Sequence, residues 1–571
     1  MSNSYITPDE LFERVGDILS LYSSAPHTVN RRLHDTLALA CDGALRNSQQ
    51  AFGNLFSKVD FLRKQHRVPV RDVVAIQQMR RDSNHNALLA ADDFAYHCRA
   101  LCLFISAVYE VHIPNTLVGR IPTQNRPYEK RPHIDYKYIR AIVLRWDNTL
   151  LWADADENEI ETPLQIDCSA SHLTYLRTLL SAGMQINLLD CATHGNVLIP
   201  QLVIVEPDFL VDISSIARCF TDYRHHPLTY TVQRMMPHTN SQAILLGSFA
   251  GAALDDIINN KHAYNWQQTF TNTFKERMLE FCTCPDLNSR ISFKEAAIKQ
   301  AQNIQQIVNQ LFENKSEGFD RSKAILEPSF VCEQLGLQGR VDLMTTDFRL
   351  LVEQKSGTNY NIERHQTNTY GSLQKEEHYV QLLLYYGVLR HNFHLGNKHA
   401  DIRLLYSKYP LPDGLIVVSY LQQLFHEAIQ LRNEIVSQDF NIAQTGFEQV
   451  IDKLLPETLN EAPLDTPFYN KFIYPRISAV THPLHNLSPL ERAYFCRMMT
   501  FVYREQQLAK VGSEAEKGNS NADLWQMPTA EKRETGNIFT GLQLAKIEAS
   551  NSYNGLVTVY LRQVKTTARP R

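Results

Sequence analysis

The stretch EPSFVCEQLGLQGRVDLMTTDFRLLVEQKSG, Glu327–Gly357, decides the fold. It contains two apolar-rich runs, GRVDLM and RLLVEQK, on either side of the connection Thr345–Asp347, and this pattern predicts an antiparallel hairpin. Because strand side chains alternate between faces, Glu353 and Lys355 are predicted to project from the same side. Asp342 falls on the partner strand, so three charged groups are expected to converge at one rim of a buried hairpin.

Buried charges point to a metal site, because burial is costly unless a charge is paired or metal-bound. Asp342 and Glu353 would repel each other, and a divalent cation relieves that repulsion. Oxygen ligands without a nearby His or Cys set favour Mg²⁺ or Mn²⁺. Lys355 is then placed to orient a metal-bound water or to stabilise developing phosphorane charge. The alternative is a surface hairpin with an ordinary Glu–Lys pair.

A helix is predicted downstream, in EEHYVQLLLYYGVLR (Glu376–Arg390). His378, Gln381 and Tyr385 are spaced i, i+3 and i+7, which places them on one face. We expect Gln381 to fix the active-site water or Lys355, and Tyr385 to reach a phosphate. The alternative is a core helix whose polar residues only lie at its edge.

These motifs resemble the RecB-like branch of the PD-(D/E)XK nucleases, which carries a G-x-x-D strand, an E-x-K strand and a Q-x-x-x-Y helix. Within that branch the chain is most similar to the nuclease domain of the flap-trimming replication nuclease–helicase, and CRISPR-adaptation nucleases are similar too. Two upstream segments, EPDFLVDISSIARCF (Glu206–Phe220) and LLGSFAGAALDDII (Leu245–Ile258), carry the closer resemblance. It covers roughly residues 206–510.

The resemblance implies an α/β fold of the restriction-endonuclease-like type, a mixed sheet flanked by helices. It also implies metal-dependent cleavage of DNA phosphodiester bonds, in single strands or flaps, within a replication and repair system. The catalytic residues it implies are Asp342, Glu353, Lys355, Gln381 and Tyr385. The DNA contacts we expect are Arg340, Tyr385 and His378.

The chain departs from the family at the first motif, which usually places a metal-binding His four residues after a Gly. Here Gly247 is followed at that spacing by Gly251. Asp255 lies one helical turn further on with Asp256 beside it, and either is a candidate substitute ligand; we assign the metal to Asp342, Glu353 and Asp255. If the motif is lost instead, the chain is a catalytically impaired nuclease-fold module that binds DNA or serves as a scaffold for a helicase.

Many relatives also hold a four-iron–four-sulfur cluster, through one Cys before the first motif and three closely spaced Cys after the helix. Cys219 matches the first position, but Cys496 is the only Cys downstream of the helix, so no iron–sulfur cluster is expected. The sequence contains no G-x-x-x-x-G-K-[ST] phosphate loop, so the helicase motor of such relatives is a partner missing from this chain.

The pattern along the chain predicts a helical domain over 1–115, a linker over 116–137, a small β-rich domain over 138–206 and the nuclease domain over 207–510. Residues 511–571 are expected to form a linker and the start of a truncated β domain, with two strands joined at Tyr553–Gly555. The basic and aromatic residues of Arg126–Arg140 are expected either to grip nucleic acid or to form a solvated connector.

The overall composition excludes few classes of protein. The net charge of −4 over 571 residues neither favours nor opposes DNA binding, since only local positive charge is required. Ten scattered cysteines favour a reducing compartment. The N-terminus lacks a signal-peptide pattern, and no apolar run approaches about twenty residues, so we expect no membrane span and a cytoplasmic location.

Overall fold

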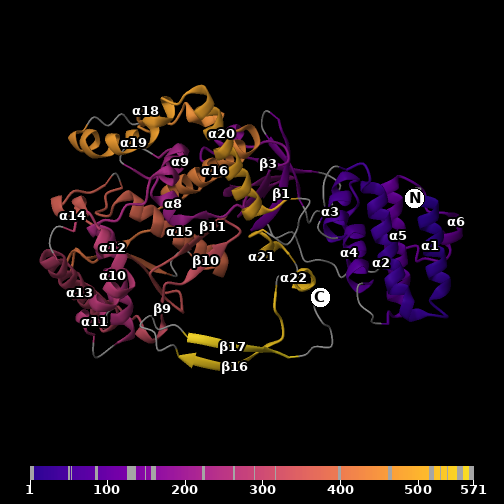
Figure 1. Ribbon diagram of the computed structural model, residues 1–571, viewed down its shortest axis with the longest axis horizontal. Coiled ribbons are helices and arrows are strands. Elements are labelled where there is room, and N and C mark those ends of the chain that lie inside the picture. Colours follow the sequence, from indigo (N-terminus) through magenta and orange to yellow (C-terminus); the bar gives the residue numbers. More distant parts are fainter. Residues whose placement is uncertain are drawn as a thin grey trace. The chain divides into compact units, whose positions relative to one another are not determined.

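The computed structural model is mixed α/β, as the sequence predicts (Figure 1). It describes residues 6–48, 52, 55–83, 88–124, 137–147, 150–155, 163–221, 225–260, 264–287, 290–314, 317–368, 370–396, 400–460, 466–513, 520–527, 529–536, 538–549 and 557–564. The chain divides into two compact units, one of Met1–Ile134 with Leu508–Ile538 and Pro570–Arg571, the other of Asp135–Gln507 with Phe539–Arg569. Within the described ranges, no helix has both the length and the apolar character needed to cross a membrane.

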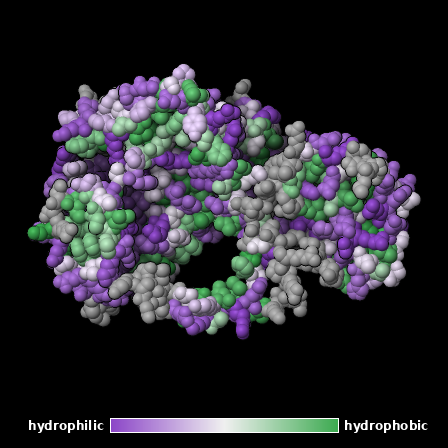
Figure 2. Space-filling model, viewed as in Figure 1, coloured by the Kyte–Doolittle hydropathy of each residue, from purple (hydrophilic) through white to green (hydrophobic). Residues whose placement is uncertain are grey.

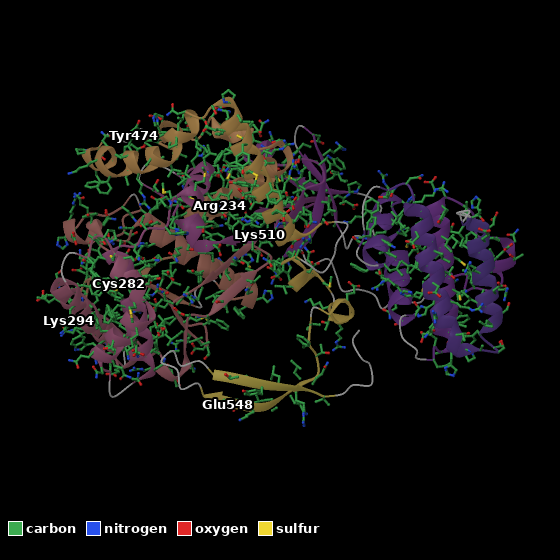
Figure 3. All side chains as sticks on the ribbon, viewed as in Figure 1. Arg234, Cys282, Lys294, Tyr474, Lys510 and Glu548 are labelled. Carbon is green, nitrogen blue, oxygen red and sulfur yellow. The ribbon has the colours of Figure 1, made fainter. Side chains whose placement is uncertain are left out.

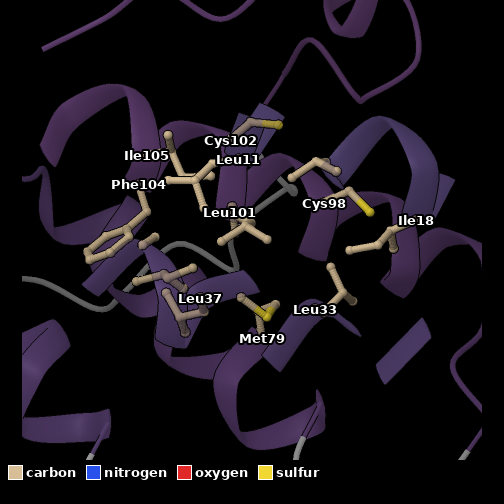
Figure 4. Packing of buried hydrophobic residues seen from close by; sticks show 14 of the residues in the cluster. Leu11, Ile18, Leu33, Leu37, Met79, Cys98, Leu101, Cys102, Phe104 and Ile105 are labelled. Carbon is tan, nitrogen blue, oxygen red and sulfur yellow. The ribbon is translucent and has the colours of Figure 1, made fainter. Parts of the chain in front are cut away.

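The first unit is helical. Its helices are α1 (Pro8–Leu21), α2 (Val29–Leu45), α3 (Leu55–Gln65), α4 (Val70–Ser83), α5 (Ala91–Tyr109), α6 (Asn115–Val118), α21 (Asp523–Gln526) and α22 (Thr529–Thr535). Helix α1 begins at a capping box in which Thr7 and Glu10 satisfy each other's backbone N–H groups. Apolar side chains at helical spacing, such as Leu11, Leu33 and Leu101, are fully buried between the helices (Figure 4).

The predicted β-rich region forms a sheet in the order β5-β6-β3-β2-β1-β4-β7. Its strands are β1 (Tyr138–Trp146), β2 (Leu150–Ala155), β3 (Leu164–Asp167), β4 (Gln185–Leu189), β5 (Ala192–His194), β6 (Val197–Ile199) and β7 (Leu202–Val205), with the short helix α7 (Leu176–Leu179). The basic and aromatic segment before it lies outside the described residues, apart from its last four. Arg140, at its end, is in β1 and pairs with Asp208, so it is not available to nucleic acid.

The second sheet is mixed, with the order β15-β14-β13-β12-β9. Its strands are β9 (Ala324–Leu326), β12 (Leu343–Thr345), β13 (Leu350–Lys355), β14 (Asp401–Tyr406) and β15 (Leu415–Val418). Neighbours are antiparallel except β13 and β14, which are parallel and are connected through α15 (Glu376–Phe393). Helices α10 (Gln242–Asn259) and α13 (Arg290–Phe312) pack on the face that presents Leu343, Val352 and Leu405.

The segment predicted as a linker before the two C-terminal strands also contains α21 and α22. The first strand of the predicted hairpin differs from the sequence prediction as well. The run GRVDLM, expected as a single strand, is divided between two sheets. Its first residues complete β11 (Leu337–Arg340), which pairs with β10 (Ser329–Cys332) and β8 (Val211–Asp212). The backbone then crosses to the mixed sheet, held by the bonds Val341 N to Pro328 O (3.2 Å) and Glu327 N to Asp342 O (3.0 Å). Asp342 therefore lies at the junction of two sheets, not within a strand.

The remaining helices surround these sheets. They are α8 (Ile213–Ala217), α9 (Pro227–Met235), α11 (Trp266–Glu276), α12 (Met278–Thr283), α14 (Tyr360–Arg364), α16 (Gln422–Thr445), α17 (Glu448–Ile451), α18 (Pro456–Leu459), α19 (Tyr474–His485) and α20 (Pro489–Val511). Arg234, labelled in Figure 3, ties α9 to α16 through an ion pair with Asp439 at 3.1 Å.

The two strands expected near the C-terminus are present as β16 (Leu542–Ala549) and β17 (Val557–Gln563), which pair antiparallel. The turn expected at Tyr553–Gly555 lies outside the described residues. Apolar side chains such as Leu544, Ile547 and Leu561 are exposed on this two-stranded ribbon (Figure 2).

Candidate active site

A cleft of about 260 Å³ opens where α10, the ends of β12 and β13, and the start of α15 meet. Segments far apart in the sequence contribute to it, and its lining includes Gly251, Asp255, Glu327, Asp342, Lys355 and His378. We call it the candidate catalytic cleft. Most of the residues predicted from the sequence as site residues lie in its wall or bond directly to a residue that does.

The predicted hairpin is confirmed, because Leu343 pairs with Val352 and Met344 with Leu351. Its connection is longer than predicted and includes Phe348, whose φ of 57° is left-handed. Just before β12, the Asp342 carboxylate accepts a hydrogen bond from the backbone N–H of Gln354 at 2.6 Å. This bond fixes Asp342 against the opposite strand near Glu353 and Lys355.

Glu353, Lys355 and Gln381 form a hydrogen-bonded group. The Lys355 ammonium donates to Glu353 Oε1 at 3.0 Å and to Gln381 Oε1 at 2.7 Å. The Gln381 amide in turn donates to Glu353 Oε1 at 2.8 Å. Glu353 is only 4% exposed, and its Oε2 is buried and meets no donor within the described part of the chain. Gln381 thus holds Lys355, one of the two roles expected for it.

The pKa values of the acidic residues at the cleft are raised, as expected where several carboxylates lie close together with few positive charges beside them. Burial, and after it the Asp342 carboxylate, raise the pKa of Glu353. Burial also raises the pKa of Asp342. Burial, followed by Glu327 and Asp342, raises the pKa of Asp255 to about 7. Each carboxylate disfavours ionisation of the next, which is the situation that a bound cation relieves.

Helix α10 determines which first-motif residues face the cleft. Asp255 lines it, whereas the Asp256 carboxylate accepts a hydrogen bond from Thr269 and is directed elsewhere. Of the two candidate ligands, Asp255 is therefore the one in place. Gly251 also lines the cleft, and a Cβ added there would have none of the described atoms within 4 Å. The position at which the nucleases that the motifs resemble carry a His is thus open space.

Glu327 is a cleft residue that sequence reasoning did not assign. Its backbone is bonded to that of Asp342, and its carboxylate pairs with Arg340 Nη1 at 3.0 Å. Glu327 stands directly before a Pro and belongs to no helical or strand periodicity that would place it in a site. Its place follows from the pairing of β9 with β12, which brings the residue after β9 beside the residue before β12.

The three predicted DNA contacts have different environments. Arg340 is well exposed, with 59% of its side chain accessible. His378 lines the cleft, with Nδ1 2.9 Å from the Tyr406 hydroxyl. Burial, then Lys355 and Lys375, lower the pKa of His378 to about 2, so its imidazole is neutral. Tyr385 is buried and its hydroxyl donates to the Arg340 carbonyl at 2.6 Å; this bond positions the end of β11 and occupies the proton that would reach a phosphate.

The cysteines discussed for a cluster lie in separate elements. Cys219 is buried after α8 and its thiol donates to the Ser215 carbonyl at 3.3 Å. Burial raises its pKa to about 12, which keeps it a thiol. Cys496 is buried in α20. A further cysteine, Cys282, which no cluster motif includes, is exposed in α12 and is labelled in Figure 3.

The donor chemistry of the cleft fits a hard divalent cation. Asp342, Asp255 and Glu327 supply oxygen atoms, and Glu353 has a buried oxygen without a donor. Over the described ranges, no three His, Cys, Asp or Glu side chains stand together as a ready-made metal site. Mg²⁺ usually needs only one or two carboxylates, because it keeps several waters and binds substrate phosphates. Of the three ligands expected from the sequence, Asp342 and Asp255 line the cleft, whereas Glu353 is buried, is bonded to Lys355 and does not belong to the lining.

Compared with protein-family models and with curated proteins, the sequence matches none of them. The resemblance to PD-(D/E)XK nucleases therefore rests on the sequence motifs alone.

Proposed function

We propose that the chain is a Mg²⁺- or Mn²⁺-dependent nuclease that cleaves phosphodiester bonds in single-stranded or flap DNA. We further propose that its mixed sheet with flanking helices is a restriction-endonuclease-like core. In this proposal it acts in DNA replication or repair beside a helicase motor, in a reducing compartment such as the cytoplasm.

One observation carries the proposal. Asp342 and Lys355 line the same cleft, and Lys355 is hydrogen-bonded to both Glu353 and Gln381. The three motifs of the resemblance thus contribute to one group of side chains, although Asp342 and Gln381 are 39 positions apart in the sequence. The alternative for these residues is an ordinary Glu–Lys pair on the surface, where such pairs are exposed and contribute little to stability. Glu353 is buried instead. Burying the Lys355–Glu353 pair costs desolvation free energy, and a catalytic role would account for keeping it buried.

The side chains then have distinct roles. A metal ion held by Asp342, Glu353 and Asp255 would polarise the scissile phosphate and lower the pKa of a bound water. Lys355 has no acceptor atom and is therefore not a ligand. It stabilises the negative charge that develops on the phosphate, and Gln381 keeps it in position. Neutral His378 offers a hydrogen bond to substrate without adding charge, and Arg340 attracts the DNA backbone.

The alternative function is a nuclease-fold module that binds DNA without cutting it, or that serves as a scaffold. Gly251 favours this alternative, because it leaves open space where relatives place a ligand. The bond between Lys355 and Glu353 also favours it, because the ammonium already neutralises a carboxylate that the metal would need. The two functions differ in whether DNA is cleaved at all.

The test is digestion of end-labelled flap and single-stranded DNA with Mn²⁺, Mg²⁺ or EDTA. The proposal predicts cleavage that requires the metal and is lost in Asp342→Ala. Cleavage by Asp342→Ala at the wild-type rate would assign the activity to a contaminant. Metal-independent DNA binding without cleavage would establish the scaffold, and labelled RNA of the same sequence tests the preference for DNA.

A further inference from the structure

A second groove lies next to the candidate catalytic cleft. Its volume is about 520 Å³, within the range of sites that hold small molecules. We call it the flanking groove. Its wall is made by strands β10 and β11, with residues of β8, α8 and α15. The side chains that matter for its chemistry are Asp212, Ser214, Ser329, Phe330, Gln338 and Arg340.

Three links connect the flanking groove to the candidate catalytic cleft. Arg340 lines the groove and Asp342 lines the cleft, and two residues of chain span at most about 7 Å. Arg340 also pairs with Glu327, a cleft residue, at 3.0 Å. Gln381 lines the groove while its amide holds Lys355 and Glu353. A ligand that fills both sites therefore passes over Arg340.

The lining of the flanking groove fits one nucleotide. Arg340 is exposed and supplies positive charge for a phosphate. Phe330 is a partly buried aromatic ring, held edge-on against Phe393 at 6.3 Å, and aromatic rings stack on any base. Ser214 and Ser329 carry hydroxyls that both donate and accept. Asp212 accepts from Gln338 at 2.9 Å and has further acceptor capacity for an amino group.

We propose that the flanking groove binds the nucleotide next to the scissile phosphate of a single strand. This inference rests on the proposed nuclease function and adds a substrate subsite to it. In this proposal the base stacks on Phe330 and is unpaired, because a base held in a duplex stacks on its neighbours instead. The subsite thus accounts for a preference for single strands over duplex DNA.

The test uses groove-filling variants and a matched control. Ser329→Trp places a large ring at an exposed position of the groove, and Phe330→Leu removes the aromatic face. Val417→Trp is the control, because Val417 is equally a strand residue, is 63% exposed and lies in β15, outside both sites. Binding of a fluorescent single-stranded oligonucleotide is measured by anisotropy in EDTA, so that no cleavage occurs.

We expect Ser329→Trp and Phe330→Leu to weaken binding about 5- to 150-fold, the range for losing one stacked base. Val417→Trp should bind like the wild type. An oligonucleotide with one abasic position in the subsite should bind the wild type weakly, and Ser329→Trp should weaken it no further. Equal binding by Ser329→Trp, Phe330→Leu and Val417→Trp would overturn the proposal.

Single-turnover cleavage with Mn²⁺ separates this inference from the proposed function. If the wild type cleaves and both groove variants bind and cleave like it, the subsite is wrong and the nuclease stands. If the groove variants lose binding but the wild type does not cleave, the flanking groove binds a single strand, but it is not a subsite beside a scissile phosphate and the nuclease is wrong.

Discussion

Replacing Lys355 by Met should destabilise the metal-free site by a predictable amount. The substitution removes the ammonium and retains most of the apolar stem. Glu353, which is 4% exposed, would keep the Gln381 amide at 2.8 Å but lose its counter-charge at 3.0 Å. Removing one partner of a buried ion pair costs about 3–5 kcal/mol. We expect the low end, about 3 kcal/mol at a pH where Glu353 is ionised, because Lys355 is 21% exposed.

The effect should depend on pH with a defined sign. The pKa of Glu353 is raised in the folded protein, so the folded state favours its protonated form. Protonated Glu353 needs no counter-charge, and the cost of Lys355→Met should therefore shrink as the pH falls through about 8, the value to which burial raises the pKa of Glu353. The double variant Glu353→Gln/Lys355→Met removes both charges, so it should recover most of the lost stability and show little pH dependence.

Hydrogen exchange is the suitable assay, because a chain of two units does not unfold in a single transition. Protection of the β13 amides reports the local free energy of opening. It should be measured in EDTA at pH 9 and pH 6 for the wild type, the single variant and the double variant. Equal protection of β13 in all three proteins would refute the reasoning that Lys355 compensates a buried Glu353.

Three further predictions concern metals. Calorimetry with Mn²⁺ should show binding that Asp342→Ala weakens strongly and Asp256→Asn leaves unchanged; similar losses in both variants would remove the metal from this cleft. Gly251→His should tighten Mn²⁺ binding about tenfold, or about 1.4 kcal/mol, because the new ring enters open space; unchanged affinity would mean that it faces away. Protein purified anaerobically should contain no stoichiometric iron, and iron with a cluster absorbance spectrum would contradict the missing cysteine set.

Local periodicity was sufficient to predict part of the site. Alternation along β13 placed Glu353 and Lys355 on one side, and helical spacing put Gln381 on the face of α15 that meets them. These predictions succeeded because each depends only on the regular geometry of one element or one hairpin. The mixed α/β class was expected from the resemblance, and the structure confirms that class.

Other features depend on long-range pairing and were missed. The division of GRVDLM between two sheets requires β8 and β10 on one side and β9 and β13 on the other. Glu327 enters the cleft only through that pairing. His378 is neutral because burial, with Tyr406 of β14 at its Nδ1, removes it from water. The hydroxyl of Tyr385 is taken by the Arg340 carbonyl, which no spacing along α15 indicates.

The most direct test of the central claim is single-turnover cleavage of flap and single-stranded DNA at saturating Mn²⁺, by the wild type and by Lys355→Met. DNA binding by both proteins should be titrated in parallel. Loss of one electrostatic stabiliser typically slows the chemical step by about 10²–10³. We therefore predict that Lys355→Met cleaves about 10²–10³ times more slowly while its DNA affinity is nearly unchanged. Equal cleavage rates, or no metal-dependent cleavage by the wild type on either substrate, would contradict the account.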